Sequence, residues 1–437
     1  MEKKSCDVVV IGAGIGGLCL AARLAYTGYR TIVLEKMPIL GGRFTYVDYK
    51  GYCIPTGALV IYYGWKDPVI QTIKDVGGRY DFDMKEMPPP RWRIGGTDHD
   101  TPSKNVLWHL ISLASRDKQE EERVITALRR AFRWAAPSDY INFSEWLLRL
   151  TDNPTIWNIL QAWCVQILGF NLYDVPAGYL VRYFLNFRGG EQLLPKGGLK
   201  PIVDSLAKVL IDNNGEIIPS IETQRINVSD GKAVGIEAKG RGFKLEIDAR
   251  VVVSNVGPKK TVELAGFDNF DRGYLQEIKE LRPLEGFWFM VSSDGPLYDW
   301  PGGLYAPESR RWQLGIDYSL TWPELAPKGK NWMGFYTIPD HPTIYNPRKE
   351  YELFMADLSD LFPNMNKQHA EILLARRFCS DWPNVRVWPS SDRHQKPPVE
   401  NLYNVGDGVN PAGWMGGSGA AESARIVAND IMGRVKL

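Results

Sequence analysis

The sequence predicts an α/β protein in which a discontinuous sheet-and-helix domain is interrupted by a second domain of antiparallel strands and helices. Three observations lead to this prediction. Residues 7–36 alternate strand, glycine turn, helix and strand patterns. Two later segments, 193–258 and 400–435, carry further buried strands and glycine turns. The stretches 60–192 and 266–395 are rich in Trp, Tyr and Pro and do not follow this alternation, so we expect them to form the insertion.

The composition is that of an ordinary globular protein with room for two or three domains. The 437 residues are 44% hydrophobic and 24% charged. A net charge of +1 argues against a nucleic-acid partner, which would require a basic face. The five cysteines show no CxxC spacing, and there is no HExxH motif, so we expect neither a disulfide framework nor a metal site. This cysteine usage favours a reducing, cytoplasmic location.

Two apolar segments resemble membrane or targeting signals. The first follows MEKKSC, but Asp7 and several glycines interrupt it, which argues against a signal peptide. The second, residues 153–173, has no charged residue, and polar residues break its helical apolar spacing. That pattern favours a buried or pocket-lining helix over a membrane span. Peripheral attachment through a helix lying in the membrane interface is the alternative.

The first element predicted in detail is a strand followed by a glycine-rich turn. Residues 8–11 form a β-branched run suited to a strand buried on both faces. Gly12, Gly14 and Gly17 then form a GxGxxG pattern, which also includes Gly16. The first glycine permits the turn, the second lets a diphosphate approach the backbone, and the third allows close packing of helix on strand. Gly28 is placed to end the helix.

A second strand, residues 31–34, delivers a carboxylate to the same edge. Glu35 stands at its end, where it can accept both ribose hydroxyls of an adenosine, and Lys36 follows it. A bare GxGxxG is weak evidence, but the strand, the helix and Glu35 in register favour a dinucleotide site. The motif alone does not separate NAD from FAD. The GGR of residues 41–43 adds backbone amides at Gly42 and the guanidinium of Arg43 for the same diphosphate.

With these motifs the chain resembles the flavin-dependent amine oxidase and phytoene desaturase superfamily. Its members open with this strand, GxGxxG, helix, strand and Glu, followed by GGR. The resemblance implies an FAD-binding Rossmann-like domain of the glutathione-reductase type. It also implies oxidation of a substrate carbon by hydride transfer to the flavin.

The resemblance continues through residues 193–258. A PKGG segment at 195–198 leads into an amphipathic helix and then into a hairpin centred on 229–231. In the phytoene desaturase branch, the first strand of this hairpin carries the residue beside the adenine. That residue is usually valine in the family and is Thr223 here. The resemblance therefore implies the main-chain contacts with the adenine, but not the contact made by the valine side chain. The buried strand at 247–254 resembles the returning strand that brings Asn255 beside the cofactor.

The third matching segment is GDGVNPAGWMGGSGAAESARIVANDI, residues 406–431. The resemblance implies that Gly406 and Asp407 meet the ribityl or phosphate end of FAD. It places the amides of Met415 and Gly416 at flavin N1 and the C2 carbonyl, where a helix N-terminus stabilises negative charge. Trp414 occupies the position of an aromatic substrate wall in amine oxidases. The alternative is a tryptophan that packs under the sheet.

These segments divide the chain. We expect residues 1–85, 192–265 and 395–437 to form the FAD-binding domain, and 86–191 and 266–394 to form the substrate-binding domain. The charged segment 117–135 is typical of a solvated helix. The segments EGFWFMVSS, RRWQLGID and NWMGFYTIP alternate aromatic residues as antiparallel strands do. Several aromatic residues are candidates for the pocket wall: Tyr62, Tyr63, Trp65, Trp288, Trp312, Trp332 and Tyr336.

The predicted activity is FAD-dependent oxidation of an apolar or cyclic small molecule, with carbon–carbon desaturation or dehydrogenation favoured by the PKGG segment. The GWMGG motif keeps a carbon–nitrogen amine oxidase as an alternative, beside a redox-neutral isomerase and a non-catalytic lipid-binding module. We expect non-covalent FAD because the closing segment lacks cysteine, the nearest being Cys379. The electron acceptor is oxygen, a quinone or a carrier. A proton-transfer residue and the oligomeric state cannot be assigned.

Overall fold

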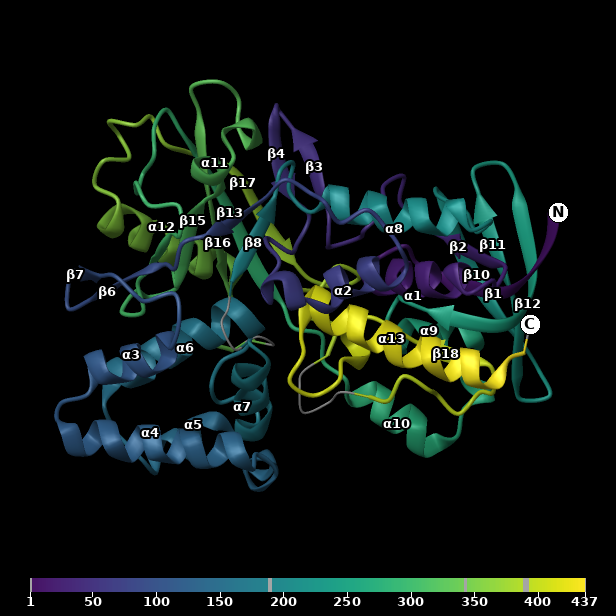
Figure 1. Ribbon diagram of the computed structural model, residues 1–437, viewed down its shortest axis with the longest axis horizontal. Coiled ribbons are helices and arrows are strands. Elements are labelled where there is room, and N and C mark those ends of the chain that lie inside the picture. Colours follow the sequence, from purple (N-terminus) through teal and green to yellow (C-terminus); the bar gives the residue numbers. More distant parts are fainter. Residues whose placement is uncertain (1, 188–190, 342–343, 388–392, 437) are drawn as a thin grey trace.

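The computed structural model of the protein describes residues 2–187, 191–341, 344–387 and 393–436. Two large sheets lie side by side in Figure 1, the first on the right and the second at the upper left, and the two chain ends lie together beside the first. The predicted α/β class, with a Rossmann-like sheet and a second, mostly antiparallel sheet, is confirmed. Residues 188–190 and 388–392, next to the predicted domain boundaries, lie outside the described residues.

The first sheet collects strands from three distant parts of the chain. Its order is β10-β11-β12-β1-β2-β9, with β18 beside β12. Strand β1 pairs in parallel with both β2 and β12, so the glycine motif follows a central strand. The strands are β1 (Glu2–Ile11), β2 (Thr31–Leu34), β9 (Glu216–Ile218), β10 (Ile221–Ser229), β11 (Lys232–Gly240), β12 (Lys244–Ser254) and β18 (Leu402–Asn404).

Strand β1 is buried on both faces, as its β-branched run predicts. Val8 and Val10 join the core under one layer of helices, while Val9 and Ile11 join the core under another. The first layer contains α1 (Ile15–Tyr26), α2 (Pro68–Asp75), α8 (Lys200–Asp212) and α13 (Gly416–Arg434). The second contains α9 (Pro258–Ala265) and α10 (Arg272–Glu280). Helix α10 therefore packs against the first sheet, although it falls within the segment 266–394.

The second sheet has the order β17-β13-β16-β15-β14-β6-β7, and its ladders are antiparallel except for β14 with β6. Alternation along β13 sends Phe289 onto Phe354 of α12 (Pro347–Leu361), and Trp288 to the opposite face. Its strands are β6 (Arg91–Ile94), β7 (Thr97–His99), β13 (Gly286–Ser293), β14 (Leu304–Tyr305), β15 (Leu314–Asp317), β16 (Asn331–Thr337) and β17 (Glu371–Phe378).

Five helices form a separate layer at the lower left of Figure 1. They are α3 (Val106–Ala114), α4 (Lys118–Arg133), α5 (Phe143–Leu148), α6 (Pro154–Leu168) and α7 (Ala177–Asn186). The uncharged α6 is buried along most of its length, as the sequence predicts. Within the described ranges, every helix is too short or too polar to cross a membrane.

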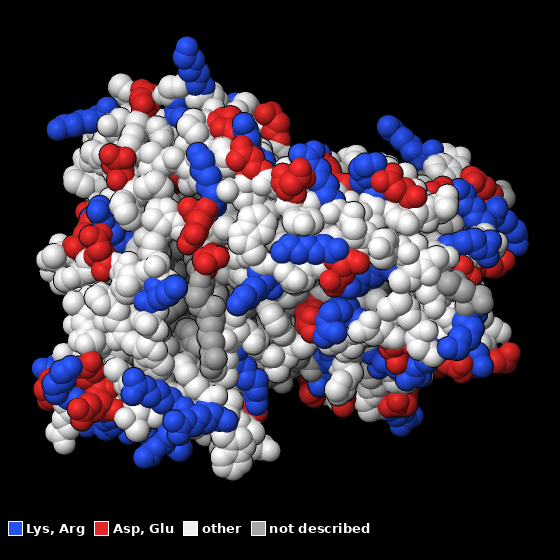
Figure 2. All heavy atoms as spheres, viewed as in Figure 1, with Lys and Arg blue, Asp and Glu red and all other residues white. Residues whose placement is uncertain are grey.

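Short elements complete the described fold. These are β3 (Tyr46–Tyr49), β4 (Tyr52–Pro55), β5 (Met84–Met87), β8 (Gln192–Pro195) and α11 (Tyr318–Thr321). Charged side chains of both signs are interspersed over the surface shown in Figure 2.

Candidate functional site

A cavity of about 470 Å³ is lined by residues from both sheets and from α6 and α13. One part lies at the carboxyl ends of the parallel strands, where open α/β sheets bind ligands. We call this part the glycine side; it comprises Gly12, Gly14, Gly16, Glu35, Gly42, Arg43, Asn255, Gly406 and Asp407. We call the other part the aromatic side; it comprises Tyr62, Gln166, Leu168, Trp288, Tyr336 and Phe378.

The turn after β1 has the geometry that its glycines predict. Gly12 has a φ of +95°, and its N–H donates to the Leu34 carbonyl oxygen at 2.7 Å. A Cβ on Gly17 would lie 2.2 Å from the Gly12 carbonyl oxygen, so helix and strand approach too closely for any side chain. Gly17 is therefore a packing residue and does not itself line the cavity.

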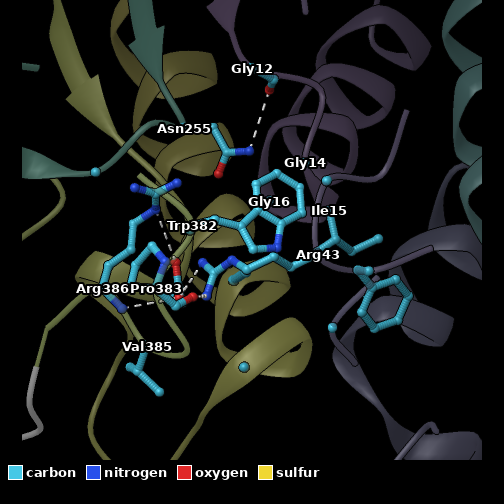
Figure 3. A pocket seen from close by; sticks show the side chains of 18 of the residues that line it. Gly12, Gly14, Ile15, Gly16, Arg43, Asn255, Trp382, Pro383, Val385 and Arg386 are labelled. Atoms are coloured by element: carbon cyan, nitrogen blue, oxygen red, sulfur yellow. Dashed lines mark hydrogen bonds and ion pairs between the residues drawn. The ribbon is translucent and has the colours of Figure 1, made fainter. Parts of the chain in front are cut away.

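Asn255, which follows β12, fills the space that the other glycines leave. A Cβ on Gly14 would lie 2.6 Å from Asn255 Nδ2, and one on Gly406 would lie 2.6 Å from Asn255 Oδ1. The Asn255 amide donates to the Gly12 carbonyl oxygen at 3.3 Å (Figure 3). Turned by 180°, the amide instead accepts from the Gly14 and Gly17 N–H groups at 3.2 and 3.3 Å and donates to the Val405 carbonyl oxygen at 3.3 Å. In either orientation Asn255 joins its own segment to the glycine turn.

Glu35 is buried, with 7% of its surface exposed, and both carboxylate oxygens bind backbone. Oε2 accepts from the Ala13 N–H and Oε1 from the Met37 N–H, each at 2.8 Å. Each oxygen keeps a second lone pair for a ligand hydroxyl. Lys36 is exposed and lies 4.0 Å from Asp381.

Arg43, Asp407 and Arg386 form an ion cluster in the cavity wall (Figure 3). Arg43 Nη2 donates to Asp407 Oδ2 at 2.5 Å, and Nη1 donates to the carbonyl oxygens of Pro383 and Asn384. Burial opposes ionisation of Asp407, but the charges of Arg43 and Arg386 outweigh burial and lower the pKa of its carboxyl. Burial, reinforced by Arg43, lowers the pKa of Arg386 to about 10. Arg386 was not predicted from the sequence.

Two helix N-termini open onto the cavity, and neither N-cap residue supplies a side-chain cap; at α1 the turned Asn255 amide accepts from the Gly17 N–H. The N-cap residues are Gly14 for α1 and Met415 for α13. Uncapped N–H groups and the helix dipole favour negative charge at both places. No heavy atom lies within 4 Å of the position a Cβ would take on Gly416, whose φ is +52°. The bare backbone at α13 therefore leaves room for a flat ring.

Thr223 of β10 lines the cavity beside these groups and is 8% exposed. Its Oγ1 has no hydrogen-bond partner among the described residues. A buried hydroxyl without a partner is unusual, which indicates that a ligand supplies one. Together with Glu35 and the two open helix N-termini, it makes the glycine side fit a flavin dinucleotide.

The aromatic side is formed by side chains from distant elements. Tyr62, Trp288 and Tyr336 line it, as predicted. Burial raises the pKa of Tyr62 to about 12 and that of Tyr336 well above its ordinary value. Both hydroxyls therefore stay protonated at neutral pH and act as hydrogen-bond donors.

Several predicted wall residues lie elsewhere. Trp312, two residues before β15, packs with Phe335 and Phe362 on the face of the second sheet that is turned away from the cavity. Trp332 and Tyr63 are core residues, and Trp65 is 41% exposed.

Trp414 is not among the residues that line the cavity. Its ring lies 5.0 Å from the ring of Tyr63, and its carbonyl oxygen accepts from the Tyr179 hydroxyl at 2.8 Å. The packing alternative considered for this residue matches its position better than the substrate wall does.

Further lining residues were not singled out from the sequence, among them Asp67, Gln166 and Trp382. Asp67 accepts from the Ser418 hydroxyl of α13 at 2.6 Å. Burial raises the pKa of the Asp67 carboxyl to about 6 despite this hydrogen bond. Asp67 and Trp382 stand in segments without a motif, whereas Gln166 gives a signal as a polar residue within an apolar helix.

Comparisons with known proteins agree with this geometry. The sequence model of the family described as flavin containing amine oxidoreductase matches residues 15–432. An uncharacterised protein of Methanocaldococcus jannaschii is 25% identical over 97% of this chain and 98% of its own. A prolycopene isomerase of Daucus carota is 26% identical over 58% of this chain, and a phytoene desaturase of Rhodobacter capsulatus is 28% identical over 56%. These matches cover 46% and 52% of the two enzymes, about half of their length.

Solved structures extend the likeness to the whole chain. An oxidoreductase from Methanosarcina mazei is 27% identical, with a TM-score of 0.87 over 97% of this chain and 100% of that chain. A putrescine oxidase shares the fold at 14% identity, with a TM-score of 0.74 over 99% of this chain and 100% of its own.

Proposed function

The chain belongs to the flavin containing amine oxidoreductase family, and on that premise we propose that it is an FAD-dependent oxidoreductase that removes a hydride from a carbon of an apolar small molecule. We assign it to carbon–carbon desaturation or dehydrogenation. The observation that carries this proposal is that one cavity joins the glycine side to the aromatic side. A substrate held by the aromatic residues would then meet a cofactor held by the glycine turn.

The residues that would hold FAD are those with free hydrogen-bonding capacity on the glycine side. Glu35 would accept the adenosine ribose, the N-terminus of α1 and Arg43 would bind the diphosphate, and Thr223 would lie at the adenine. When bound, FAD supplies the two-electron acceptor. The lining lacks cysteine within the described ranges, which supports non-covalent binding.

The N-terminus of α13 and the aromatic side would divide the remaining tasks. The uncapped amides after Met415 favour negative charge where electrons arrive. Trp288, Tyr336 and Phe378 would exclude water and orient the reacting carbon. Tyr62 would donate a hydrogen bond, because its pKa of about 12 keeps its proton at neutral pH.

The relatives favour desaturation over amine oxidation. Relatives that align with more than half of this chain are named phytoene desaturase and prolycopene isomerase. The named amine oxidase shares 14% identity, which supports the fold alone. A redox-neutral isomerase at the same site is the second candidate, because the isomerases match over a similar length. Because the chain matches only about half of the length of these enzymes, their named substrates are not part of the proposal.

The visible spectrum of the purified protein tests this function, followed by anaerobic photoreduction and readmission of air. We expect a yellow protein that reoxidises slowly, as a desaturase or dehydrogenase that uses a quinone or carrier does. Rapid reoxidation would replace this assignment with an oxidase and favour amine substrates. A colourless protein that cannot be reconstituted with FAD would overturn the enzymatic proposal in favour of a lipid-binding module.

A further inference from the structure

Gln166 is a buried amide on the aromatic side that the protein itself does not satisfy. It stands near the end of α6, next to Ile167 and Leu168, and lines the cavity with 8% of its surface exposed. Its Oε1 is buried and has no hydrogen-bond partner among the described residues. Gln313 Oε1 and Asn410 Oδ1 are also buried without a partner in the described part of the chain, but only Gln166 of the three lines the cavity. A ligand in the cavity is therefore the group that can complete the hydrogen bonding of Gln166.

Gln161 of the same helix provides the contrast. Its Nε2 donates to Asn171 Oδ1 at 2.6 Å, and its Oε1 accepts from the Leu172 N–H at 2.9 Å. That amide holds the chain after α6 in place, so its polarity has a structural explanation. Gln166, five positions later, has no such explanation.

The position of Gln166 places it beside the aromatic residues. It precedes Gly169 by about one helical turn, and a Cβ on Gly169 would lie 3.3 Å from the Tyr336 hydroxyl. Tyr336 is in turn the cross-strand partner of Trp288. Trp288 Nε1, in contrast, lies 3.4 Å from the position of a Cβ on Gly334, next to core rings that do not line the cavity.

We propose that Gln166 is a specificity-determining residue that hydrogen bonds a neutral hydroxyl group on an otherwise apolar substrate. This inference rests on the proposed function and names the substrate class of the same site. A hydroxyl group can donate a hydrogen bond to the oxygen of Gln166. A pure hydrocarbon would leave this oxygen unpaired, which disfavours its binding.

The residues that define the aromatic side favour a neutral group, and Asp67, elsewhere in the cavity lining with a pKa of about 6, already accepts a hydrogen bond from Ser418. The members of the aromatic side carry no formal charge at neutral pH. The guanidinium of Arg376 lies 5.9 Å from the Trp288 ring and already donates to the Thr56 carbonyl oxygen at 2.9 Å. A charged group buried here would require an ionic partner.

The test compares two ligand pairs that differ by one hydroxyl: limonene with perillyl alcohol, and farnesene with farnesol. Each is titrated into the FAD-loaded protein while the visible flavin spectrum is recorded. We expect each alcohol to bind about tenfold more tightly than its hydrocarbon, the effect of one net hydrogen bond. In Gln166→Leu, which keeps the volume but removes the amide, this preference should disappear.

Two controls make the result specific. Gln166→Leu should retain flavin at the wild-type ratio. Gln161→Leu should lower thermal stability and leave the alcohol preference intact. The inference is overturned by equal affinities in the wild type, by a preference that survives in Gln166→Leu, or by the absence of any response to both alcohols. Flavin loss in Gln166→Leu would also overturn it, by assigning the amide to the cofactor. A colourless wild type would instead defeat the proposed function.

Discussion

The glycine side of the cavity combines bare backbone with the side chains of Glu35, Arg43, Asn255 and Asp407, whereas the aromatic side is built from side chains. On the glycine side, Gly14 and Gly406 approach Asn255 so closely that a methyl group would collide with it. On the aromatic side, Tyr62, Gln166 and Trp288 come from a loop, a helix and a strand that are distant in sequence.

This difference implies different tolerance to change. Close contacts restrict the glycine side, because a new Cβ on Gly14 or Gly406 would lie 2.6 Å from the Asn255 side chain and one on Gly16 would lie 3.1 Å from the Gly406 backbone. A site formed by side chains can be altered one residue at a time while the sheets stay intact. We therefore expect substitutions on the glycine side to affect flavin retention and folding together, and those on the aromatic side to affect substrate choice.

The largest expected effect is that of Gly17→Ala. The new Cβ would lie 2.2 Å from the Gly12 carbonyl oxygen, and backbone cannot move aside without separating α1 from β1. We expect a loss of about 3 kcal/mol in the free energy of unfolding, at the upper end for overpacking, together with loss of bound flavin. Thermal unfolding and the ratio of flavin to protein absorbance measure both.

Gly433→Ala is the matched control for this substitution. Gly433 lies in α13, and no heavy atom is within 4 Å of its Cβ position. Alanine there should raise stability by about 0.5 kcal/mol through helix propensity and should leave flavin bound. Similar behaviour of the two variants would contradict the view that the glycine side is fixed by backbone contact.

Glu35→Ala should produce the next largest effect. Its carboxylate accepts from two backbone N–H groups and is proposed to accept ribose hydroxyls, and charged hydrogen bonds of this kind are strong. We expect FAD affinity to fall about 10- to 100-fold, measured by the fluorescence of released flavin. Trp414→Ala, outside the cavity lining, should keep its flavin. Equal flavin loss in Glu35→Ala and Trp414→Ala would contradict the view that Glu35 contacts the flavin and Trp414 only packs behind the cavity.

The sequence was informative about the glycine side because that side is encoded locally. The pattern consists of a strand, three glycines at fixed spacing and Glu35, all within 30 residues. Each glycine is explained by a requirement of the backbone: a turn, a close approach of the ligand, or packing of helix on strand. The second sheet could also be anticipated, because the segments that form β13 and β16 are rich in aromatic residues. The contact of Asn255 with Gly12 and Gly14 could not be anticipated. These residues are more than 200 positions apart in the chain, and such a contact leaves no periodic pattern in the sequence.

The sequence predicted that aromatic residues line the aromatic side, but it did not identify which of them do. Trp288 stands in β13 and Trp312 stands two residues before β15, yet Trp288 lines the cavity and Trp312 packs on the opposite face. Which face a strand residue takes depends on register, and a shift of one residue reverses it. Gln166 gave a usable signal, a polar residue within an apolar helix, but Gln161 gave the same signal and is structural.

A smaller effect is expected from Asp67→Asn, at the base of α13. Burial raises the pKa of Asp67 to about 6, above the unfolded value of about 3.9. The folded state therefore binds the proton more tightly, so the contribution of Asp67 to stability is full below about pH 4 and is lost as the pH rises to about 6. Asparagine should remove this dependence and raise stability at pH 8 by about 1–2 kcal/mol relative to the wild type. Thermal unfolding of the flavin-free protein at pH 5 and pH 8 measures it, and equal pH dependence in both proteins would contradict the burial of an ionisable group.

The smallest effect is expected from Thr223→Val, and it tests whether the Thr223 side chain contributes to FAD binding beside the glycine side. Valine matches the shape of threonine and removes only the Oγ1 that lacks a partner in the described structure. If that hydroxyl binds the adenine portion of FAD, the dissociation constant should rise about 3- to 10-fold in the valine variant and stay near the wild-type value in Thr223→Ser. If the Thr223→Val variant binds FAD as tightly as the wild type, main-chain atoms alone make the adenine contacts at this strand. Strand β10 would then contribute to FAD binding through its main chain alone. In that case the difference between the glycine side and the aromatic side, where side chains make the contacts, would be larger.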